Sequence, residues 1–305
     1  MQASPAPAPL RGADHSSEKH PDRRQCSVIM RVFHIRLLFV FLTTFPFASA
    51  QNGATDALPP IEKIIEKALA RAEWQKKLEI SRTSVAELIK VTERLDDEGS
   101  TESKEEIVFR ESLHDGHYFH EKILVNGRKL TEREANDEKA RKEKFLREIE
   151  RNRGNKSYKP KNDRVEFNRE LVERYQAKLA GRETVHGREA YVIEFEPRYG
   201  KLPVRRRMDY ALNKSNGRVW IDSEDYGIAR VEFHLMEPVR LWYGILGNVT
   251  VADGLVETSR NEEGFWLPRE MKIYMDGRIL FTSLHHRSLR RWRYPDEGES
   301  LSVGH

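Results

Sequence analysis

Cysteine is almost absent from this chain of 305 residues, because Cys26 is the only one. Cys26 lies within the first fifty residues, so disulfide bonds, cysteine zinc sites, iron–sulfur clusters and thiol catalysis are excluded from the rest of the chain. Long apolar runs are missing too. The strongly apolar run from Leu37 to Phe47 is roughly half of the ~20 residues that a membrane-spanning helix needs. The sequence therefore excludes a transmembrane bundle.

A surplus of one charge sign is also missing from most of the chain. The formal net charge is +4, but residues 1–50 hold six Lys/Arg and three Asp/Glu. The other 255 residues carry 47 basic and 46 acidic groups. A dedicated nucleic-acid binder has a basic footprint, so this balance argues against one. A chain of this length, 38% hydrophobic and 33% charged, can form one large domain or two small ones.

Motifs for catalysis are lacking. No Gly-x-Ser-x-Gly elbow, phosphate-cradling glycine loop or paired-histidine helix motif occurs. His114, His117 and His120 are spaced like metal ligands, but in a strand His117 points away from the other two, so we predict no metal site. The carboxylates within 222–225 are expected to be solvated turn residues. We predict a protein that is not an enzyme and uses no cofactor, with an envelope hydrolase as the least favoured alternative.

The front of the chain is typical of a secretory signal peptide. Basic residues precede an apolar run at 37–42, and Ala48-Ser49-Ala50 provides a small-residue cleavage site. We predict a signal peptide over 30–50, cleaved near Ala50, and a soluble, exported, periplasmic product. The polar stretch 1–29 is either a disordered leader or a mis-assigned start, with Met30 as the other possible start. A buried helix at 35–47 is the alternative interpretation of the apolar run.

After Pro59-Pro60, the spacing predicts an amphipathic helix over 61–78, whose apolar stripe must lie against another apolar surface. The stripe consists of Ile61, Ile64, Ile65, Ala68, Leu69 and Ala72. This helix is the candidate lid of a binding site, and a permanently packed helix is the alternative.

A long region rich in turn signals follows, with roughly ten residues between turns, which leaves no room for crossover helices. The signals end in glycine at Gly99, Gly116, Gly127, Gly187, Gly217, Gly227, Gly254, Gly264 and Gly277. The β-rich segments between them are 106–111, 118–125, 190–196, 218–221, 228–235, 255–258, 265–274 and 278–284. We therefore predict a large antiparallel sheet. Alternation places Val231, Phe233 and Leu235 on one face of it.

One insertion interrupts the strands. Residues 131–153 predict a charged helix, either solvent-exposed or an interaction arm, and 154–164 predict a polar linker. The i, i+4 spacing of Phe167, Leu171, Tyr175 and Leu179 predicts a second short helix. We expect a single domain over 51–295 with a charged helical insertion at 131–164, followed by a disordered tail at 296–305.

A strongly twisted antiparallel sheet can curl into a groove, which an apolar ligand can occupy when side chains leave it unfilled. Aromatic residues are frequent in the C-terminal strands, and simple core packing is the alternative interpretation of each. The candidate ligand-binding residues of the apolar concavity are Ile64, Leu69, Trp220, Phe233, Leu235, Trp242, Trp266 and Phe281.

Two dense basic runs could meet anionic lipid headgroups or an acidic partner surface. The candidate contacts are Arg205, Arg206, Arg207, Arg290 and Arg291. A solvated face balanced by nearby acids is the alternative.

The strand motifs resemble those of the LolA/LolB-like lipoprotein-carrier superfamily. The likeness is carried by 188–197, which includes Ala190-Tyr191-Val192, by Val219-Trp220-Ile221-Asp222, and by Ile228-Ala229-Arg230-Val231. It covers most of 60–295 and also resembles exported proteins of the outer-membrane lipoprotein-sorting type. The resemblance implies an α+β fold, with a large curved antiparallel sheet as an unclosed half-barrel and a helical lid. It also implies acyl chains bound in the concavity. The chain departs from the carrier in its length and its insertion, and from the LolB-type receptor in lacking a lipidated cysteine.

The leading hypothesis is therefore a periplasmic carrier that holds lipid or lipoprotein acyl chains on the concave apolar face. An acyl chain leaves water at about 0.8 kcal/mol per buried CH₂, so no catalytic group is needed for binding. The second hypothesis is a non-enzymatic module of the same fold that binds or senses envelope proteins. Peripheral contact with a membrane is compatible with both, and a nucleic-acid partner with neither.

Overall fold

The computed structural model describes residues 58–79, 86–155, 165–241, 247–279 and 282–295. All of these belong to the second of two compact units, Thr55–His305. The predicted leader, signal peptide and C-terminal tail lie outside the described residues. The helices described are α1 (Ile61–Glu79), α2 (Glu132–Arg151), α3 (Arg169–Val172) and α4 (Arg207–Leu212). The strands described are β1 (Ala86–Leu95), β2 (Thr101–His114), β3 (His117–Val125), β4 (Arg128–Lys129), β5 (Tyr175–Val185), β6 (Arg188–Pro197), β7 (Ser215–Asp222), β8 (Ile228–Leu235), β9 (Val239–Leu241), β10 (Gly247–Arg260), β11 (Trp266–Ile279) and β12 (Thr282–Arg293).

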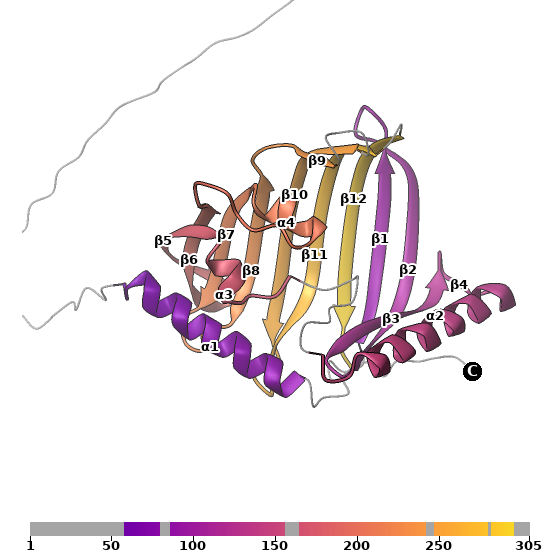
Figure 1. Ribbon diagram of the computed structural model, residues 1–305, viewed down its shortest axis with the longest axis horizontal. Helices are drawn as coiled ribbons and strands as arrows, with labels where there is room; N and C mark the ends of the chain where they lie inside the picture. The colour runs from indigo at the N-terminus through magenta and orange to yellow at the C-terminus, as the bar shows by residue number, and fades with distance from the viewer. Residues whose placement is uncertain (1–57, 80–85, 156–164, 242–246, 280–281, 296–305) are drawn as a thin grey trace, which may run out of the picture. The chain divides into compact units, whose positions relative to one another are not determined.

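The strands form a single antiparallel sheet in the order β4-β3-β2-β1-β12-β11-β10-β8-β7-β6-β5, and β9 pairs with β10 beside this path (Figure 1). Strands β4 and β5 are the two edges, so the sheet is not closed. Strand β1 pairs with both β2 and β12, which joins the two ends of the described chain in the middle of the sheet. The prediction of an α+β fold with a large open antiparallel sheet is confirmed.

Several predicted tight turns are confirmed by the backbone. Each of three pairs has a positive φ at both residues, as type I′ turns require. They are Asp115-Gly116 (48° and 78°), Asn126-Gly127 (50° and 74°) and His186-Gly187 (50° and 78°). These turns join β2 to β3, β3 to β4 and β5 to β6.

Three other predicted turns are wrong, because the glycines lie inside strands. Gly217, Gly254 and Gly277 belong to β7, β10 and β11. At Gly254, an added Cβ would lie 2.0 Å from the Phe233 ring on the neighbouring strand. The missing side chain thus makes room for an aromatic ring across the strand pair, which is a packing role and not a turn role.

The predicted helix over 167–179 is also wrong. Asn168 caps α3 by accepting a hydrogen bond from the Leu171 N–H, and the helix ends after one turn at Val172. Tyr175 and Leu179 instead belong to β5, where they pair with Pro197 and Ile193 of β6. The β5–β6 ladder therefore prevails over the local i, i+4 pattern, since tertiary pairing routinely overrides a short helical signal.

The charged helix is present as α2, and it begins with a capping box in which Thr131 and Glu134 bond each other's backbone N–H. Most of its residues are exposed, as predicted, but Glu138 and Ile149 are buried. Phe145 packs on Phe119 of β3 with ring centroids 5.0 Å apart, and the carboxylate of Glu138 accepts the Lys122 N–H at 2.8 Å. None of the helices in the described part of the chain combines the length and apolar character needed to cross a bilayer.

Candidate ligand-binding face

The two faces of the sheet are distinguished by register, because residues directly opposite each other on antiparallel strands point to the same side. Ile193 pairs with Val219, and both lie in a buried cluster with residues of α1. The neighbouring residues Val192 and Trp220 belong to a second cluster, which does not include α1. We call the side that carries Ile193 and Val219 the α1 face, and the other side the opposite face.

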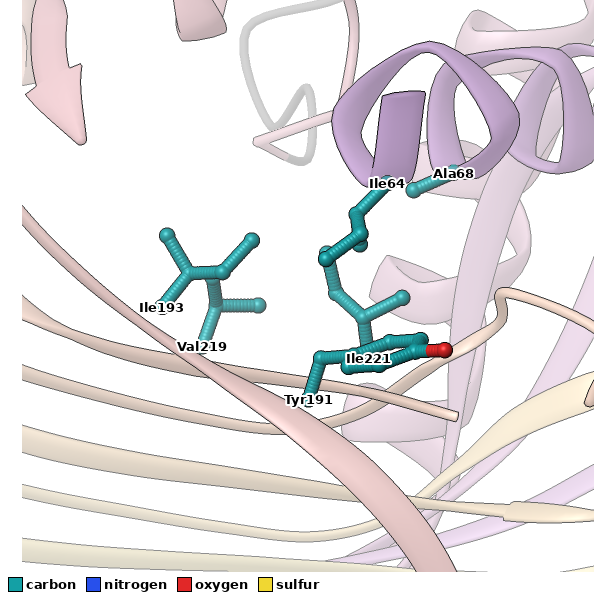
Figure 2. Close-up of a cluster of buried hydrophobic side chains, with 6 residues drawn as sticks. All are labelled: Ile64, Ala68, Tyr191, Ile193, Val219 and Ile221. Atoms are coloured by element: carbon teal, nitrogen blue, oxygen red, sulfur yellow. The ribbon is translucent and has the colours of Figure 1, made fainter. Parts of the chain in front are cut away.

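Helix α1 covers one half of the α1 face and closes it. Ile64 and Ala68 of α1 meet Tyr191, Ile193, Val219 and Ile221 of β6 and β7 (Figure 2). Ile64 and Ile221 are both 0% exposed. This half is therefore a packed core, and the space between α1 and these strands is filled by side chains.

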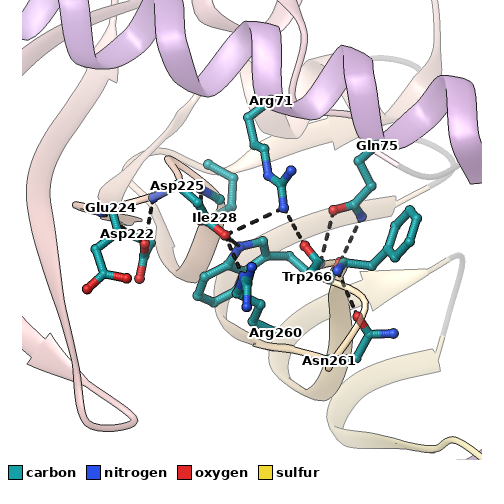
Figure 3. Close-up of polar contacts among 12 residues, drawn as sticks. Arg71, Gln75, Asp222, Glu224, Asp225, Ile228, Arg260, Asn261 and Trp266 are labelled. Carbon is teal, nitrogen blue, oxygen red and sulfur yellow. Dashed lines mark hydrogen bonds and ion pairs between the residues drawn. The ribbon is translucent and has the colours of Figure 1, made fainter.

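A polar network fastens the second half of α1 to the sheet (Figure 3). The Gln75 side chain donates to the Trp266 carbonyl at 2.8 Å and accepts from the Trp266 N–H at 3.0 Å. Arg71 forms an ion pair with Asp225 at 3.5 Å and donates to the Gly264 carbonyl. Asp225 also accepts from the Trp266 indole N–H at 2.9 Å.

Further contacts strengthen this attachment. Trp74 stacks on Phe265 with ring centroids 5.5 Å apart, and Lys76 pairs with Glu166 at 2.6 Å. Helix α1 is held by a buried apolar stripe and by side-chain bonds along its length. Of the two interpretations, a lid and a permanently packed helix, the structure therefore favours the packed helix.

The turn beneath α1 is built on a buried carboxylate. The prediction of solvated carboxylates holds for Glu224, whose side chain is 77% exposed, and is wrong for Asp222. Asp222 is 0% exposed and receives two hydrogen bonds from Arg188, at 2.6 and 2.9 Å. It also accepts the N–H groups of Glu224 and Asp225 at 3.1 and 2.9 Å. Burial alone would raise the pKa of Asp222, but these donors lower it overall. Asp222 is thus an ionised structural anchor.

Beyond α1, the same face continues across the sheet as a row of cross-strand partners. The row runs Val219, Val231, Val256, Met271, Arg290, Lys90 and Ile107, through β7, β8, β10, β11, β12, β1 and β2. It is apolar as far as β11 and becomes basic at β12 and β1. The chemical character of the α1 face therefore changes between β11 and β12.

Of the two neighbouring rows, one becomes polar but uncharged after β11 and the other becomes basic. In one, Gly254 and Ile273 are followed by Ser288 and Thr92. In the other, Met275 is followed by His286 and Arg94. We call Val256, Met271, Ile273 and Met275 the apolar floor, and Lys90, Arg94, His286 and Arg290 the basic patch.

The apolar floor is only half-buried, unlike the core under α1. Val256, Ile273 and Met275 belong to none of the buried clusters. Met271 lies at the border of the cluster formed by Ala86, Leu88 and Trp292. Among the described residues, no buried cluster that includes a helix contains residues of the floor or the patch. We call the floor and the patch together the open half of the α1 face and take it as the candidate ligand-binding face.

The predicted ligand-binding residues do not share one surface. Ile64 is buried between α1 and the sheet, Leu69 of α1 is half-buried, and Phe233 and Leu235 of β8 lie on the α1 face. Trp220 and Trp266 lie in the cluster on the opposite face. Trp242 and Phe281 lie outside the residues whose side chains are described.

Trp220 is a core residue of the opposite face. Its indole N–H donates to Glu183 at 2.8 Å, and the Arg230 guanidinium lies 5.0 Å from its ring centroid. It is 3% exposed and packs with Trp266. Both tryptophans therefore pack in the core, which was the alternative interpretation. Their positions in the strands place their side chains on the opposite face, away from the open half.

The predicted basic contacts are separated as well. Arg205 pairs with Glu170 at 3.4 Å and Arg206 with Asp209 at 3.3 Å, so two of the three consecutive arginines hold the start of α4. Arg207 is exposed. On β12, Arg290 lies on the α1 face and belongs to the basic patch, whereas Arg291 lies on the opposite face.

Sequence reasoning missed the other members of the basic patch. Lys90 and Arg94 lie in β1, a segment for which no strand was predicted. His286 was not among the predicted contacts. The basic residues of 286–290 were visible in the sequence, but their faces could not be inferred without the pairing of β12 with β1.

The described histidines do not form a metal site. His114 and His117 are cross-strand partners beside the turn, so the prediction that they face opposite sides is wrong. The turn at Asp115-Gly116 breaks the strand between them and restarts its alternation. His120 bonds the buried Glu111 at 2.7 Å. Within the described ranges, no three His, Cys, Asp or Glu residues are grouped as ligands of a metal ion.

A small enclosed pocket lies elsewhere, beside α3. Its volume of about 10 Å³ is room for roughly one water molecule. Val165, Leu171 and Arg174 are among the residues that line it. It is far too small for an acyl chain, so the open half of the α1 face remains the better candidate surface.

Comparison with known proteins finds no matching family model and no matching curated protein. Solved structures do resemble this chain. A LolA superfamily protein from Nitrosomonas europaea is 10% identical, over 77% of this chain and 92% of its own, with a TM-score of 0.33. A DUF1329 family protein from Desulfovibrio piger is 13% identical, over 80% and 96%, with a TM-score of 0.32.

A third similar structure is a domain from Vibrio parahaemolyticus described as a possible outer-membrane lipoprotein-sorting protein. It is 12% identical, over 77% of this chain and 95% of its own, with a TM-score of 0.30. The LolA superfamily that the strand motifs resemble is thus also found among the similar structures.

Proposed function

We propose that this chain is an exported, non-enzymatic binding protein that holds the acyl chain of a lipid or lipoprotein on the open half of the α1 face. The observation that carries the proposal is the apolar floor. Val256, Ile273 and Met275 form adjacent half-buried positions next to a closed core. Contiguous apolar surface of this kind is what an apolar ligand covers.

The energetics of such a surface suit a carrier. Each CH₂ that leaves water contributes about 0.8 kcal/mol, so a chain of ordinary length binds without any reacting group. Covering a floor that is already half-buried contributes less binding free energy than filling a sealed apolar cavity would. Reversible binding is therefore expected, and a carrier requires it in order to release its cargo.

The titratable groups nearest to α1 support binding rather than catalysis. Asp222 is ionised and enclosed by Arg188 and two backbone N–H groups. Asp225 is bonded to Arg71, Arg260 and the Trp266 indole. Both carboxylates are engaged in structural bonds, so neither is aimed at a substrate.

The proposal is tested by titrating the purified mature protein with a fluorescent fatty acid and by native mass spectrometry of co-purified lipid. Ile273→Gln places a polar group in the floor and is expected to weaken binding by about tenfold. Tyr274→Gln alters the next residue, which lies on the opposite face, and is the matched control. Wild-type protein that carries no lipid and binds no fatty acid would contradict the proposal.

A second candidate function is a module that binds another envelope protein. The observation that favours it is the outer side of α2, which is exposed and charged and also carries Leu146, 38% exposed. Reversing two exposed charges, Lys139→Glu and Lys144→Glu, should abolish capture of one stoichiometric protein partner without weakening fatty-acid binding. If the partner is captured equally by this variant, α2 is not the contact.

A further inference from the structure

The connection between β6 and β7 reverses the usual placement of charged and apolar side chains. Beneath it, Arg174 and Asp209 are 2% and 0% exposed and form an ion pair at 3.3 Å. A buried charge and a group of exposed large apolar side chains are both informative, because most folded chains avoid them. On the outer side of the connection, four large apolar side chains are between 44% and 94% exposed: Val204, Tyr210, Met208 and Tyr199.

These exposed side chains belong to a backbone that is held in place from below. Arg174 donates to the Pro203 carbonyl at 2.8 Å. Asp209 accepts the N–H groups of Arg205 and Arg206 at 2.8 and 3.0 Å. The apolar side chains are therefore exposed on an ordered connection, and folding leaves them in water.

The same connection carries an excess of positive charge. Residues 198–214 contain six Lys/Arg and one acidic residue, which is the buried carboxylate just described. Two acids of neighbouring segments, Glu170 and Glu237, pair with basic residues of the connection at 3.4 and 3.5 Å. Even with these acids the connection stays positive, because Lys201 and Arg207 are exposed and form no ion pair with any described residue.

The mixture of apolar and basic residues on this connection suits a membrane better than a partner protein. Val204 precedes three consecutive arginines and Met208 follows them. The core of a protein–protein interface is depleted in charged residues, so a protein that covered the apolar side chains would also have to desolvate these arginines. A bilayer meets the two needs at different depths, because its headgroups face the charges and its acyl region accepts the apolar tips. We call the exposed residues of the connection the α4 surface: Tyr199, Lys201, Val204, Arg205, Arg207, Met208 and Tyr210.

We propose that the α4 surface docks this protein on a membrane that contains anionic lipid. The basic residues of the surface meet the negative headgroups, to which juxtamembrane Lys and Arg are attracted. Val204 and Met208 enter the boundary between headgroups and acyl chains, and the two tyrosines place their amphipathic rings at the level of the headgroups. This inference goes beyond the proposed function, because the apolar floor plays no part in it.

The test is flotation of the purified mature protein with two kinds of vesicle: phosphatidylcholine alone, which has no net charge, and phosphatidylcholine mixed equally with phosphatidylglycerol, which is anionic. The wild-type protein is expected to bind the anionic vesicles at least about tenfold more tightly, and added salt should weaken this binding. Arg207→Gln should lower the affinity for the anionic vesicles about fivefold, because it removes one exposed charge. Met208→Ser should lower the affinity by a similar factor at every salt concentration, because it removes apolar contact.

Arg133→Gln is the matched control, since it removes one exposed arginine from α2 and should leave vesicle binding unchanged. Arg207→Gln should bind a fluorescent fatty acid as the wild-type protein does, which separates this inference from the proposed function. Equal binding to both kinds of vesicle, binding to neither, or equal losses with Arg133→Gln and Arg207→Gln would overturn membrane docking. Capture of an acidic protein that is lost with Arg207→Gln, in the absence of vesicle binding, would assign the α4 surface to a protein partner and likewise overturn it.

Discussion

The covered and open halves of the α1 face lie on different strands of one sheet, β6 and β7 under α1 and β10, β11, β12 and β1 in the open half. Under α1, Ile193 and Ile221 are 2% and 0% exposed, and the helix is bonded to the turns beneath it. Four strands further along, Met275 and His286 are half-buried, and Arg290 lies opposite Lys90. The first half is organised for stability. The second retains apolar side chains that are only half-buried, which stabilise the folded chain less, and this difference is what points to a ligand.

The largest expected difference between the halves is in stability. Ile221→Ala, under α1, should lower the free energy of unfolding by about 2–5 kcal/mol, because it removes fully buried methyl groups and leaves a cavity. Ile273→Ala, in the floor, should cost about 1 kcal/mol, since its side chain is only half-buried. Urea unfolding followed by circular dichroism measures both. Equal losses would mean that the floor is as tightly packed as the covered core.

The next effect is that of the buried anchor beneath α1. Asp222→Asn should cost about 2–3 kcal/mol, because it removes the buried carboxylate that accepts from Arg188 and leaves Arg188 only its pair with Glu224. The pKa of Asp222 is lowered in the folded state, so its stabilisation is complete above the ordinary pKa of 3.8 and is lost as the pH falls through the folded pKa. Unfolding of the variant should consequently depend less on pH below about 4. An unchanged pH profile would contradict the anchoring role.

A smaller effect is expected at Gly254, where the floor meets β8. Gly254→Ala should cost about 1–3 kcal/mol, because the new methyl group would overlap the Phe233 ring. Combining it with Phe233→Leu, which removes the ring, should recover part of the loss. A double variant whose losses simply add would show that the ring does not lie over the glycine.

The smallest effect compares the two faces of β12 in the absence of ligand. Arg291→Gln should destabilise by at most about 1 kcal/mol, because it breaks an exposed pair with Glu270. Lys90→Gln should be neutral or slightly stabilising, because it removes a charge directly opposite Arg290 of β12. Chemical unfolding at low salt resolves the difference, and a larger loss for Lys90→Gln than for Arg291→Gln would reverse the comparison.

Much of the fold could be predicted from the sequence, because its signals are local. The amphipathic stripe of α1 and the Asn-Gly turn at 126–127 depend on neighbours in the chain. The in-strand glycines could not be distinguished from turns in this way. Gly254 has the same Asp-Gly signature as Gly116, and only the ring of Phe233 across the ladder explains its place in a strand.

The candidate site was less predictable, because it depends on pairing between distant segments. Strand β1 lies between β2 and β12, and nothing in residues 86–95 specifies β12 as a neighbour. The basic patch exists only through that pairing. Trp220 was assigned to the ligand face because it is aromatic, whereas its register with Arg230 places it on the opposite face.

The central claim is that an acyl chain lies over β10 and β11, beside the basic patch. A dodecyl phosphate that carries a photoreactive diazirine on its chain, crosslinked to the intact protein and located by peptide mass spectrometry, tests this directly. Adducts within 252–256 and 271–275 are predicted, and excess dodecyl phosphate should suppress them. Adducts confined to α2 or to the opposite-face residues around Trp220, or no adducts that excess ligand suppresses, would contradict it.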